Sequence, residues 1–553
     1  MKPILICYPP FEGKNYLKKR APFPIGPLYL AAYLWQYDIK AKVKDFSYPP
    51  KHNKTERPSQ LQTGQSSYYR WGYSDKRLRR WLRDNLPSYH DVVGVSSLMS
   101  SNWTGAYALV RLIKEVSPKT TIVMGGPHAT AFPDHVFKYS LTDYVCLGEG
   151  EEAFLSLLQG DNHEAIISRR GGGFNSVQRT SFIKDLDTIP FPRRTMLLDD
   201  RETKETYVTF SRACPHKCSF CGSHIIQGRV WRNKSVDVVL DEIAWYYSEW
   251  GVRHFVIEDD NPCPKGVGMK HFKEILREIV QMRKDGFRMS FNVSHGIPVY
   301  ATADPEMCEL LWDAGFKLMS FPVESTNRHV LKDMNKTTVL DHWERAIENW
   351  SEYARGPHPV QIILGYPFVQ TIKTMLQTML DIHSKGCLVW ASHFRLNKGT
   401  ELYERCLKKR YIDETYDPIN TQAFFLETER FKKKDLQELM QISRGLNFAT
   451  EQGFNILEEN ISCKSFHSFN PAPPMDGVVA EGGFAFKRNQ NVAASIMLVR
   501  TENFPGGRPF VRFGKDNKTL IYGGIKFSRV YNELYAILTG RESIIKKYLR
   551  RRK

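Results

Sequence analysis

The sequence predicts an α/β protein with three parts: a doubly wound, Rossmann-like parallel sheet, a partial barrel of six βα units, and a C-terminal α+β domain. Three observations predict this architecture. Short apolar runs alternate with helical patterns as far as residue 400, glycines follow several of these runs, and 553 residues are too many for one hydrophobic core. The expected boundaries are 1–165 for the first domain, 166–199 for a linker, 200–400 for the barrel and 401–553 for the last domain.

The first domain is expected to bind its ligand at the carboxyl ends of parallel strands. Glycine turns follow the apolar runs at 121–124 and 143–147, and glycine lets a ligand approach the backbone closely. Segment 50–74 is polar and rich in turn formers, so we expect an insertion or a long loop there. The expected strands are 3–7, 41–46, 91–96, 121–124 and 143–147, and the expected helices are 25–36 and 103–116, the latter with Ala106, Leu109, Val110 and Ile113 on one face.

A second series of alternating strands and helices predicts the barrel. Helical patterns fill each gap between its strands, and parallel strands need such crossovers. Beyond the barrel the pattern is helical to about residue 459, followed by strand-like pieces at 494–499 and 519–522 and a closing helix at 528–538. The expected barrel strands are 207–211, 254–258, 289–293, 318–323, 360–364 and 388–394.

Composition and charge exclude some classes of protein. Hydrophobic residues make up 42% of the chain, as in globular proteins, and no apolar run is long enough to cross a bilayer, so we expect a cytoplasmic protein without membrane insertion. The net charge of +18 includes basic runs that we interpret as solvated faces. The alternative is a patch that binds an anionic partner, either nucleic acid or an acidic protein. Charge alone does not separate this alternative from solvated faces.

Three of the ten cysteines fall within eight residues, in Cys214-Pro-His-Lys-Cys218-Ser-Phe-Cys221, directly after the first barrel strand. In a chain without a secretory signal, such a cluster is typical of a metal site rather than of disulfides. Three thiolates at this spacing can hold an iron–sulfur cluster and leave one iron open to a small molecule. Structural zinc is the alternative, since His216 and His224 offer a fourth ligand, but barrels place their active sites at this end of their strands.

The cysteine loop resembles that of the radical SAM superfamily. The resemblance implies a [4Fe–4S] cluster on the three cysteines, an open iron that binds S-adenosylmethionine, and an external electron donor that triggers its cleavage to a 5′-deoxyadenosyl radical. Val323, Phe368 and Lys398 depart from the usual residues of the family's motifs. Matching segments follow the later barrel strands, and the resemblance assigns S-adenosylmethionine binding to Asp259, Asp260, Ser294, Glu324, Ser325 and Gly365.

The first domain resembles the cobalamin-binding domain that precedes many radical SAM barrels. Segments 24–31, 92–97, 125–130 and 148–151 carry this resemblance in the expected order. A flavodoxin-like domain for some other ligand is the alternative, because each glycine turn alone is a weak signal. The resemblance implies that cobalamin is bound by Ser96, Ser97, Leu98, Met99, Gly125, Gly126, His128, Gly148 and Glu149.

A histidine beneath the cobalt is not expected. Segment 381–386 matches the histidine motif of base-off cobalamin proteins, but it falls near the end of a barrel helix instead of after the first strand of the cobalamin domain. The loop in the corresponding place, 8–13, has no histidine. Cys7, or a side chain near Leu98 and Met99, is the candidate to face that side of the cobalt.

Together the two resemblances imply a class B radical SAM methyltransferase that uses methylcobalamin to methylate an unactivated carbon. One S-adenosylmethionine would supply the radical that removes a substrate hydrogen, and a second would remethylate the cobalt. The cofactors carry this chemistry, while the protein sets distances and excludes water. Tyr366 and His393 are the candidate catalytic residues, and a packed structural role is the alternative for His393.

The substrate is open. The basic surface and the additional C-terminal domain leave room for a protein or peptide, and a glutamine of methyl-coenzyme M reductase is one candidate; small antibiotic precursors, lipids and tetrapyrroles are others. Rival hypotheses are a cobalamin radical enzyme that cyclises or rearranges its substrate, an enzyme that modifies nucleic acid, and a cobalamin sensor without catalysis. A methylthiotransferase acting on transfer RNA is disfavoured because it needs three more cysteines in the first domain, which has only Cys7 and Cys146.

Overall fold

Two units make up the computed structural model, and each is described by itself. The first comprises residues 1–295, 309–317 and 395–424, and the second comprises residues 296–308, 318–394 and 425–553. Among the described residues, no helix has the length and apolarity required to span a membrane. The structure describes residues 2–13, 23–48, 59–63, 66–98, 100, 103–169, 182–199, 201, 204–413, 416, 426–451, 453, 455, 457, 511–513, 520–522, 525–527 and 529–539.

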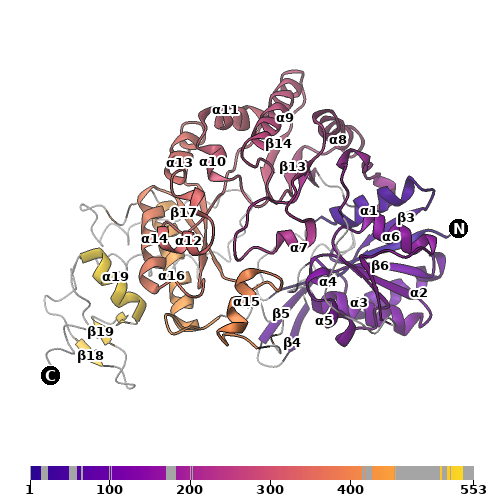
Figure 1. Ribbon diagram of the computed structural model, residues 1–553, viewed down its shortest axis with the longest axis horizontal. Coiled ribbons are helices and arrows are strands. Elements are labelled where there is room, and N and C mark those ends of the chain that lie inside the picture. The colour runs from indigo at the N-terminus through magenta and orange to yellow at the C-terminus, as the bar shows by residue number, and fades with distance from the viewer. Residues whose placement is uncertain are drawn as a thin grey trace. The chain divides into compact units, whose positions relative to one another are not determined.

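The first unit begins with a six-stranded sheet. Its strands are β1 (Ile4–Tyr8), β3 (Ala41–Asp45), β6 (Val92–Ser96), β7 (Thr121–Gly125), β8 (Tyr144–Cys146) and β9 (Ile166–Ser168), and helices around it include α1 (Ile25–Trp35), α2 (Asp75–Asn85), α3 (Trp103–Val116) and α6 (Glu151–Gln159). The strand order is β3-β1-β6-β7-β8-β9, parallel except for the pairing of β9 with β8. Figure 1 shows α1 and α6 on one side of the sheet and α2 and α3 on the other, which confirms the doubly wound prediction.

Burial explains why these segments form this sheet. Every residue of β1 is buried, as expected for a strand covered by helices on both faces. In α3 the predicted face of Ala106, Leu109, Val110 and Ile113 is completely buried, so the helical period in the sequence identified the face that packs on the sheet. Both elements contribute to one hydrophobic core.

A small antiparallel sheet occupies part of the segment that we expected to be a loop. β2 (Phe11–Gly13), β4 (Ser59–Thr63) and β5 (Ser66–Trp71) form it in the order β2-β5-β4. Of the two alternatives for 50–74, a long loop is therefore wrong for β4 and β5, whereas 50–58 lies outside the described residues. Polar strands show no alternation of apolar residues, so the periodicity of the sequence does not reveal them.

The first unit also contains the first three barrel strands. β10 (Glu205–Val208), β13 (His254–Ile257) and β14 (Ser290–Val293) pair in parallel in the order β10-β13-β14. A two-residue antiparallel pairing of β11 (Ser211–Arg212) with β12 (Arg232–Asn233) flanks the cysteine loop. The other helices of this unit are α4 (Pro127–Ala131), α5 (Pro133–Tyr139), α7 (Ser223–Gln227), α8 (Val236–Glu249), α9 (Val267–Lys284) and α15 (Glu401–Lys408).

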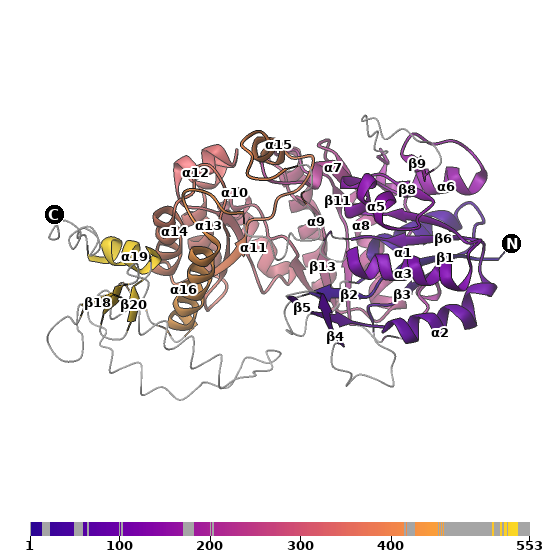
Figure 2. The ribbon, with the colours of Figure 1, turned by 90° about the horizontal axis from the view of Figure 1, so that it is seen from below.

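The second unit holds the other three barrel strands. β15 (Phe321–Glu324), β16 (Pro359–Leu364) and β17 (Leu388–His393) pair in parallel in the order β15-β16-β17, so each of the six predicted barrel strands is present. The helices between β14 and the C-terminal region, α15 apart, are α10 (Val299–Thr302), α11 (Pro305–Ala314), α12 (Arg328–Asp333), α13 (Trp343–Ser351), α14 (Ile372–Ser384) and α16 (Lys433–Glu451). Figure 2 shows α14 and α16 side by side, and α16 also packs on β17.

The C-terminal region combines strands and a helix. β18 (Val511–Phe513), β19 (Leu520–Tyr522) and β20 (Ile525–Phe527) form an antiparallel sheet, and α19 (Arg529–Thr539) follows them. β19 and α19 lie where the sequence predicts a strand and the closing helix. The predicted strand at 494–499 lies outside the described residues.

Candidate active site

One cavity of about 610 Å³ lies within the first unit, where the carboxyl ends of parallel strands from two sheets border it. A cavity of this size is typical of small-molecule sites, which span about 300–1,000 Å³. The six-stranded sheet contributes the ends of β1, β6, β7 and β8, and the barrel contributes the ends of β10, β13 and β14. Residues at these ends that line the cavity include Ser96, Gly125, Gly148, Thr209, Glu258 and Ser294.

Most residues expected to bind cobalamin line this cavity. Ser97 is an exception, because its N–H donates to the Gly125 carbonyl oxygen at 2.8 Å and its side chain is buried away from the cavity lining. Met99 lies outside the described residues. The expected residues that do line the cavity are Ser96, Leu98, Gly125, Gly126, Gly148 and Glu149.

Glycines keep one wall of the cavity open. Gly126 has a φ of +99°, and a β-carbon there would lie 2.9 Å from the Ser97 carbonyl oxygen, so glycine is required at this turn. A β-carbon on Gly26, which also lines the cavity, would meet no atom within 4 Å. Gly94 and Gly150 are further members of this wall. Backbone exposed in this way fits a broad, flat ligand such as the corrin ring of cobalamin.

His128 takes no part in the cavity lining, contrary to what its position in the sequence suggested. Its Nδ1 lies 2.9 Å from the Ser100 hydroxyl and its Nε2 lies 3.3 Å from His135 Nδ1. The ring also packs against Trp103, with centroids 4.8 Å apart. Burial, with a smaller effect of His135, lowers the pKa of His128 to about 3. The side chain is therefore neutral and packed inside the domain.

This burial predicts a loss of stability in acid. The unfolded chain binds a proton at His128 below about pH 6.5, whereas the folded chain does so only near pH 3, so the stabilising contribution is complete above pH 6.5 and is lost as the pH falls toward 3. By pH 4.5 the loss should reach about 2–3 kcal/mol. Urea unfolding between pH 7 and 4.5 measures the slope, which His128→Gln should flatten. The exposed His329→Gln is the control and should keep the wild-type slope.

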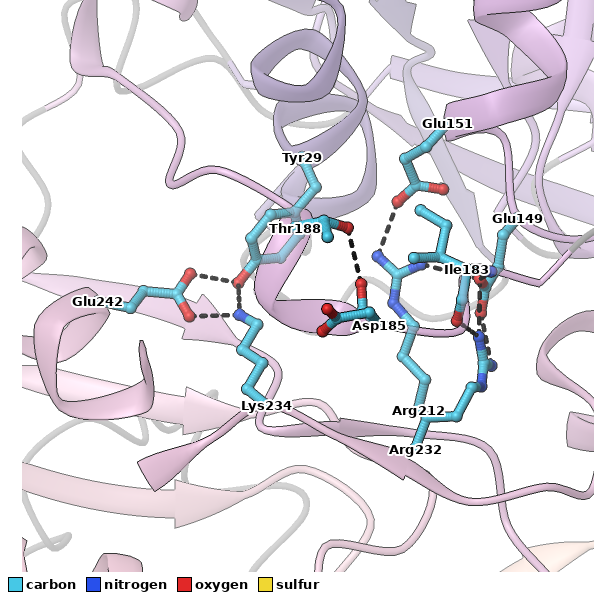
Figure 3. Close-up of polar contacts among 10 residues, drawn as sticks. All are labelled: Tyr29, Glu149, Glu151, Ile183, Asp185, Thr188, Arg212, Arg232, Lys234 and Glu242. Atoms are coloured by element: carbon cyan, nitrogen blue, oxygen red, sulfur yellow. Dashed lines mark hydrogen bonds and ion pairs between the residues drawn. The ribbon is translucent and has the colours of Figure 1, made fainter. Parts of the chain in front are cut away.

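A buried ion-pair network joins the first domain to the start of the cysteine loop (Figure 3). The Arg212 guanidinium lies 3.2 Å from Glu149 Oε2 and 2.7 Å from Glu151 Oε1. Arg232 binds Glu149 with both terminal nitrogens, at 2.8 and 3.0 Å, and Glu149 also accepts from the Ile183 N–H. Burial acts to lower the pKa of Arg212, but the carboxylates of Glu151 and Glu149 raise it overall. Arg212 therefore stays charged, and both carboxylates are engaged by protein groups.

A second buried pair lies beside this network. Lys234 Nζ is 2.5 Å from Glu242 Oε2, and the Tyr29 hydroxyl donates to Glu242 Oε1 at 2.5 Å (Figure 3). Tyr29 comes from α1 of the first domain, whereas Lys234 and Glu242 come from the barrel segment. The same interface thus contains two separate ionic clusters, which fix the first domain against β12 and α8.

The three cysteines follow β11 in one loop. Cys214, Cys218 and Cys221 are half-buried, and none forms a disulfide with another cysteine that the structure describes. Burial raises the pKa of Cys214, and the nearby Cys221 adds to this effect. Asn261 Nδ2 lies 3.9 Å from Cys214 Sγ and can donate to it. Clustered half-buried thiols with an amide donor suit an iron–sulfur cluster, whose sulfurs accept hydrogen bonds.

The zinc alternative finds little support. In the part of the chain that the structure describes, no three side chains of His, Cys, Asp or Glu gather closely enough to hold a single metal ion. Zinc needs four donors about 2.0–2.3 Å from one ion. His224, one proposed fourth ligand, places its Nδ1 3.1 Å from the Cys221 carbonyl oxygen. A cubane binds its thiolates through separate irons, so it does not require them to converge on one ion.

Asp259 stabilises the carboxyl end of the first barrel strands through hydrogen bonds. Its carboxylate accepts from the Phe210 N–H at 2.9 Å and from the Ser211 hydroxyl at 2.6 Å, so it links the end of β13 to the segment that leads into the cysteine loop. Burial raises the pKa of Asp259 to about 7, although these hydrogen bonds oppose the shift. Burial also raises the pKa of Asp260. The observed hydrogen-bond partners of Asp259 are protein groups. Of the residues in the first unit that were expected to bind S-adenosylmethionine, Ser294 lines the cavity.

Glu258 and His295 also line the cavity. Glu258 belongs to the acidic segment 258–261 that resembles the family, whereas His295 was not predicted from the sequence. Glu258 follows β13 directly and His295 comes two residues after β14, and His295 Nε2 lies 3.5 Å from Glu258 Oε2. The hydrogen bond to Glu258 raises the pKa of His295. The position of His295 just after a barrel strand is the signal that could have identified it.

The second unit carries the remaining predicted residues. Glu324 has a φ of +68°, and its carboxylate lies 2.7 Å from Lys336 Nζ. Ser325 is buried with its hydroxyl 3.2 Å from that of Thr378. Gly365 has a φ of +84°, and a β-carbon there would lie 2.9 Å from a Leu436 methyl group. Gly365 is therefore needed for the turn after β16.

The two candidate catalytic residues also lie in the second unit. Tyr366 is fully buried and its hydroxyl donates to Asp333, at 2.8 Å to the carboxylate and 3.0 Å to the carbonyl oxygen. His393 ends β17 and is half-buried. His383, from the rejected histidine motif, is buried in α14 with Nδ1 2.8 Å from the Thr450 hydroxyl. These contacts make Tyr366 and His383 parts of the packed interior.

The side chains at the end of β1 alternate between two environments. Ile6 and Tyr8 line the cavity, whereas Cys7 between them is buried and does not. Cys146, at the end of β8, lines the cavity instead, and burial raises its pKa to about 12. The suggestion that Cys7 faces the cobalt is therefore not supported by the alternation of β1.

Two family models match this chain. Residues 208–382 match the radical SAM superfamily, and residues 88–158 match the B12 binding domain. The cysteine loop lies within the first match, and the cavity-lining ends of β6, β7 and β8 lie within the second. The chain therefore contains a radical SAM domain and a B12 binding domain, and a [4Fe–4S] cluster, S-adenosylmethionine and cobalamin are its cofactors.

Several curated proteins are similar to this chain. Cytidylyl-2-hydroxyethylphosphonate methyltransferase of Streptomyces wedmorensis is 26% identical over 446 residues, 71% of this chain and 79% of the relative. Bacteriochlorophyllide d C-12(1)-methyltransferase of Chlorobaculum tepidum is 28% identical over 382 residues, 68% of this chain and 78% of the relative. Anaerobic magnesium-protoporphyrin IX monomethyl ester cyclase of Synechocystis is 26% identical over 294 residues, but the match covers only 48% of this chain and 56% of the relative.

Solved structures share the fold. The cobalamin-dependent S-adenosylmethionine radical enzyme OxsB, with aqua-cobalamin bound, gives a TM-score of 0.61 at 14% identity and covers 99% of this chain and 80% of its own. TsrM from Kitasatospora setae, with cobalamin and a [4Fe–4S] cluster bound, gives 0.57 at 16% identity and covers 73% and 78%. These similarities confirm the predicted α/β architecture.

Proposed function

We propose that this enzyme is a methyltransferase that methylates an unactivated carbon. The observation that carries the proposal is the cavity bordered both by the sheet of the B12 binding domain and by the first barrel strands, with the cysteine loop beginning two residues after cavity-lining Arg212. When bound, the cluster with S-adenosylmethionine supplies radical chemistry and cobalamin supplies the methyl group. A shared cavity suits this reaction, because groups that react must be held close together in a defined orientation.

Each set of residues in the first unit has a role in the proposed reaction. Cys214, Cys218 and Cys221 hold the cluster. The glycine-rich wall and the residues beside it bind cobalamin through backbone groups and shape. Glu149 acts indirectly, since its carboxylate holds the arginines next to the cysteine loop. His128 supports the domain from within instead of contacting the ligand.

The second unit supplies the remaining proposed roles. Glu324, Ser325 and Gly365 are proposed to bind S-adenosylmethionine. His393 is retained as the candidate catalytic residue, and Tyr366 is proposed to hold the turn after β16 through its hydrogen bonds to Asp333. An external electron donor is required, because the reductive cleavage of S-adenosylmethionine consumes an electron in each turnover.

For the substrate we propose a protein or peptide, with a glutamine of methyl-coenzyme M reductase as the first candidate. The net charge of +18 and the C-terminal region beyond the barrel support a large partner. The methyltransferase relatives bear the names of small-molecule substrates, so a small substrate is the outcome against which this part of the proposal must be tested. A cyclisation is the second candidate function, favoured by the similarity to a cyclase.

Anaerobic reconstitution with iron, sulfide and hydroxocobalamin tests this function. Incubation with S-adenosylmethionine, a reductant and a peptide containing the candidate glutamine should yield 5′-deoxyadenosine, S-adenosylhomocysteine and a peptide heavier by one methyl group. Mass spectrometry with methyl-labelled S-adenosylmethionine measures all three. A matched peptide with glutamine replaced by asparagine is the control.

The outcomes separate the candidates. Formation of 5′-deoxyadenosine with an unmethylated, dehydrogenated or cyclised product would favour the second function. Methylation of a small molecule but not of the peptide would retain the reaction and overturn the substrate. A protein that binds cobalamin yet never cleaves S-adenosylmethionine would contradict the enzymatic proposal altogether.

A further inference from the structure

Among the described residues, none forms a hydrogen bond to the hydroxyl of Tyr8, a residue that lines the cavity. Tyr8 ends β1, lines the cavity and is only 3% exposed. Its hydroxyl is completely buried and makes no hydrogen bond to any residue in the described parts of the chain. Buried polar groups in folded proteins are nearly always paired, because leaving one unpaired costs stability. A partner that arrives with a ligand would account for this hydroxyl.

The surroundings of Tyr8 make it a donor. Burial raises the pKa of Tyr8, and Asp45, Tyr207 and Glu258 nearby raise it further, so the hydroxyl keeps its proton. Asp45 is already engaged, since its carboxylate accepts from the Ser47 backbone N–H and pairs with Arg201 at 2.6 Å. Tyr207 and Glu258 line the same cavity. The Tyr8 side chain thus keeps a protonated hydroxyl near Tyr207 and Glu258, which line the ligand cavity.

We propose that the Tyr8 hydroxyl donates a hydrogen bond to an oxygen of the cobalamin bound in this cavity. The inference rests on the proposed location of cobalamin. Cobalamin carries amide carbonyl oxygens around its ring, and these would accept the hydrogen bond. The other candidate acceptor is the oxygen of a hydroxide ligand on the lower side of the cobalt. The loop after β1, segment 8–13, contains no histidine, so no imidazole from it competes with Tyr8 for this side.

A matched pair of variants tests the inference. Tyr8→Phe removes only the hydroxyl. Tyr246→Phe is the control, because Tyr246 is also fully buried with a hydroxyl that has no hydrogen-bond partner in the described residues, yet it does not line the cavity. The full-length apoprotein is titrated with hydroxocobalamin, and thermal unfolding is followed with and without it. The visible spectrum of the bound cobalamin is recorded for each protein.

We expect Tyr8→Phe to raise the Kd for hydroxocobalamin by about 5- to 10-fold. Its apoprotein should be at least as stable as wild type, since an unpaired buried hydroxyl is removed. Tyr246→Phe should keep the wild-type Kd. A change in the visible spectrum assigns the acceptor to the cobalt side, and an unchanged spectrum with weakened binding assigns it to a ring amide.

Other results would overturn the inference. An unchanged Kd for Tyr8→Phe, an equal loss of affinity in both variants, or a destabilised Tyr8→Phe apoprotein would each show that the hydroxyl serves the protein alone. Failure of the wild-type protein to bind hydroxocobalamin would instead remove the proposed function, so the two failures are distinguishable.

Discussion

Replacement of Cys218 by alanine is expected to abolish the formation of 5′-deoxyadenosine, with a loss of about three orders of magnitude or more in rate. Two cysteines cannot hold a [4Fe–4S] cluster in the way that three do, so the site for S-adenosylmethionine is lost with the cluster. Iron content and the visible absorbance of the reconstituted protein measure the cluster. Chromatography of the nucleoside products measures the reaction.

The control for Cys218→Ala is a cysteine of the packed interior. Cys308 is buried, and its thiol donates to the Thr302 carbonyl oxygen at 3.1 Å, so Cys308→Ser keeps a donor in place. This variant should retain the cluster and the nucleoside product. A Cys218→Ala protein that still cleaves S-adenosylmethionine at the wild-type rate would show that the three-cysteine loop is not the cluster site.

Replacement of Arg212 by methionine is expected to destabilise the first unit by about 3–5 kcal/mol. The methionine removes one of the two arginines that face Glu149 and Glu151, and both carboxylates are almost fully buried. A buried carboxylate without its cation costs far more than a surface pair does. Urea unfolding followed by circular dichroism measures the change, and cobalamin binding should weaken in parallel because Glu149 borders the cavity.

Two comparisons make this prediction specific. Arg80→Met breaks a pair with Asp84 whose side chains are 86% and 63% exposed, so it should change stability very little. Combining Arg212→Met with Glu151→Gln should recover part of the loss, since the unpaired charge is then removed. If Arg212→Met unfolded at the same urea concentration as Arg80→Met, the network would have no part in holding the cysteine loop.

Local sequence signals predicted most of the elements that carry the site. The buried face of α3 followed from its helical period, and the glycine turns after β7 and β8 marked the carboxyl ends that border the cavity. The cysteine spacing identified its loop without reference to the fold. Each of these signals lies within a few residues of the feature it predicts, which is why a single sequence reveals it.

Features that depend on distant segments were missed. Glu149 stands in a glycine-rich turn and looked like a ligand-binding residue, but the arginines that engage it lie 63 and 83 residues further along the chain. His128 shares a motif with cavity-lining glycines, yet the short helix α4 turns its ring toward Trp103 and His135. Tyr366 follows a functional-looking turn, but its hydroxyl meets Asp333. Spacing along the chain does not show which side of a turn a side chain occupies.

The contacts among Glu149, Glu151, Arg212 and Arg232 bear on how such enzymes can be recombined. A chimera that takes its vitamin-binding half from one homologue and its barrel from another would bring acidic residues and arginines that had not been matched to each other. Transplants that carry all four positions together should mature into enzyme, whereas those that divide them should accumulate as insoluble protein. The two halves should therefore be exchanged together, although each resembles a domain found elsewhere.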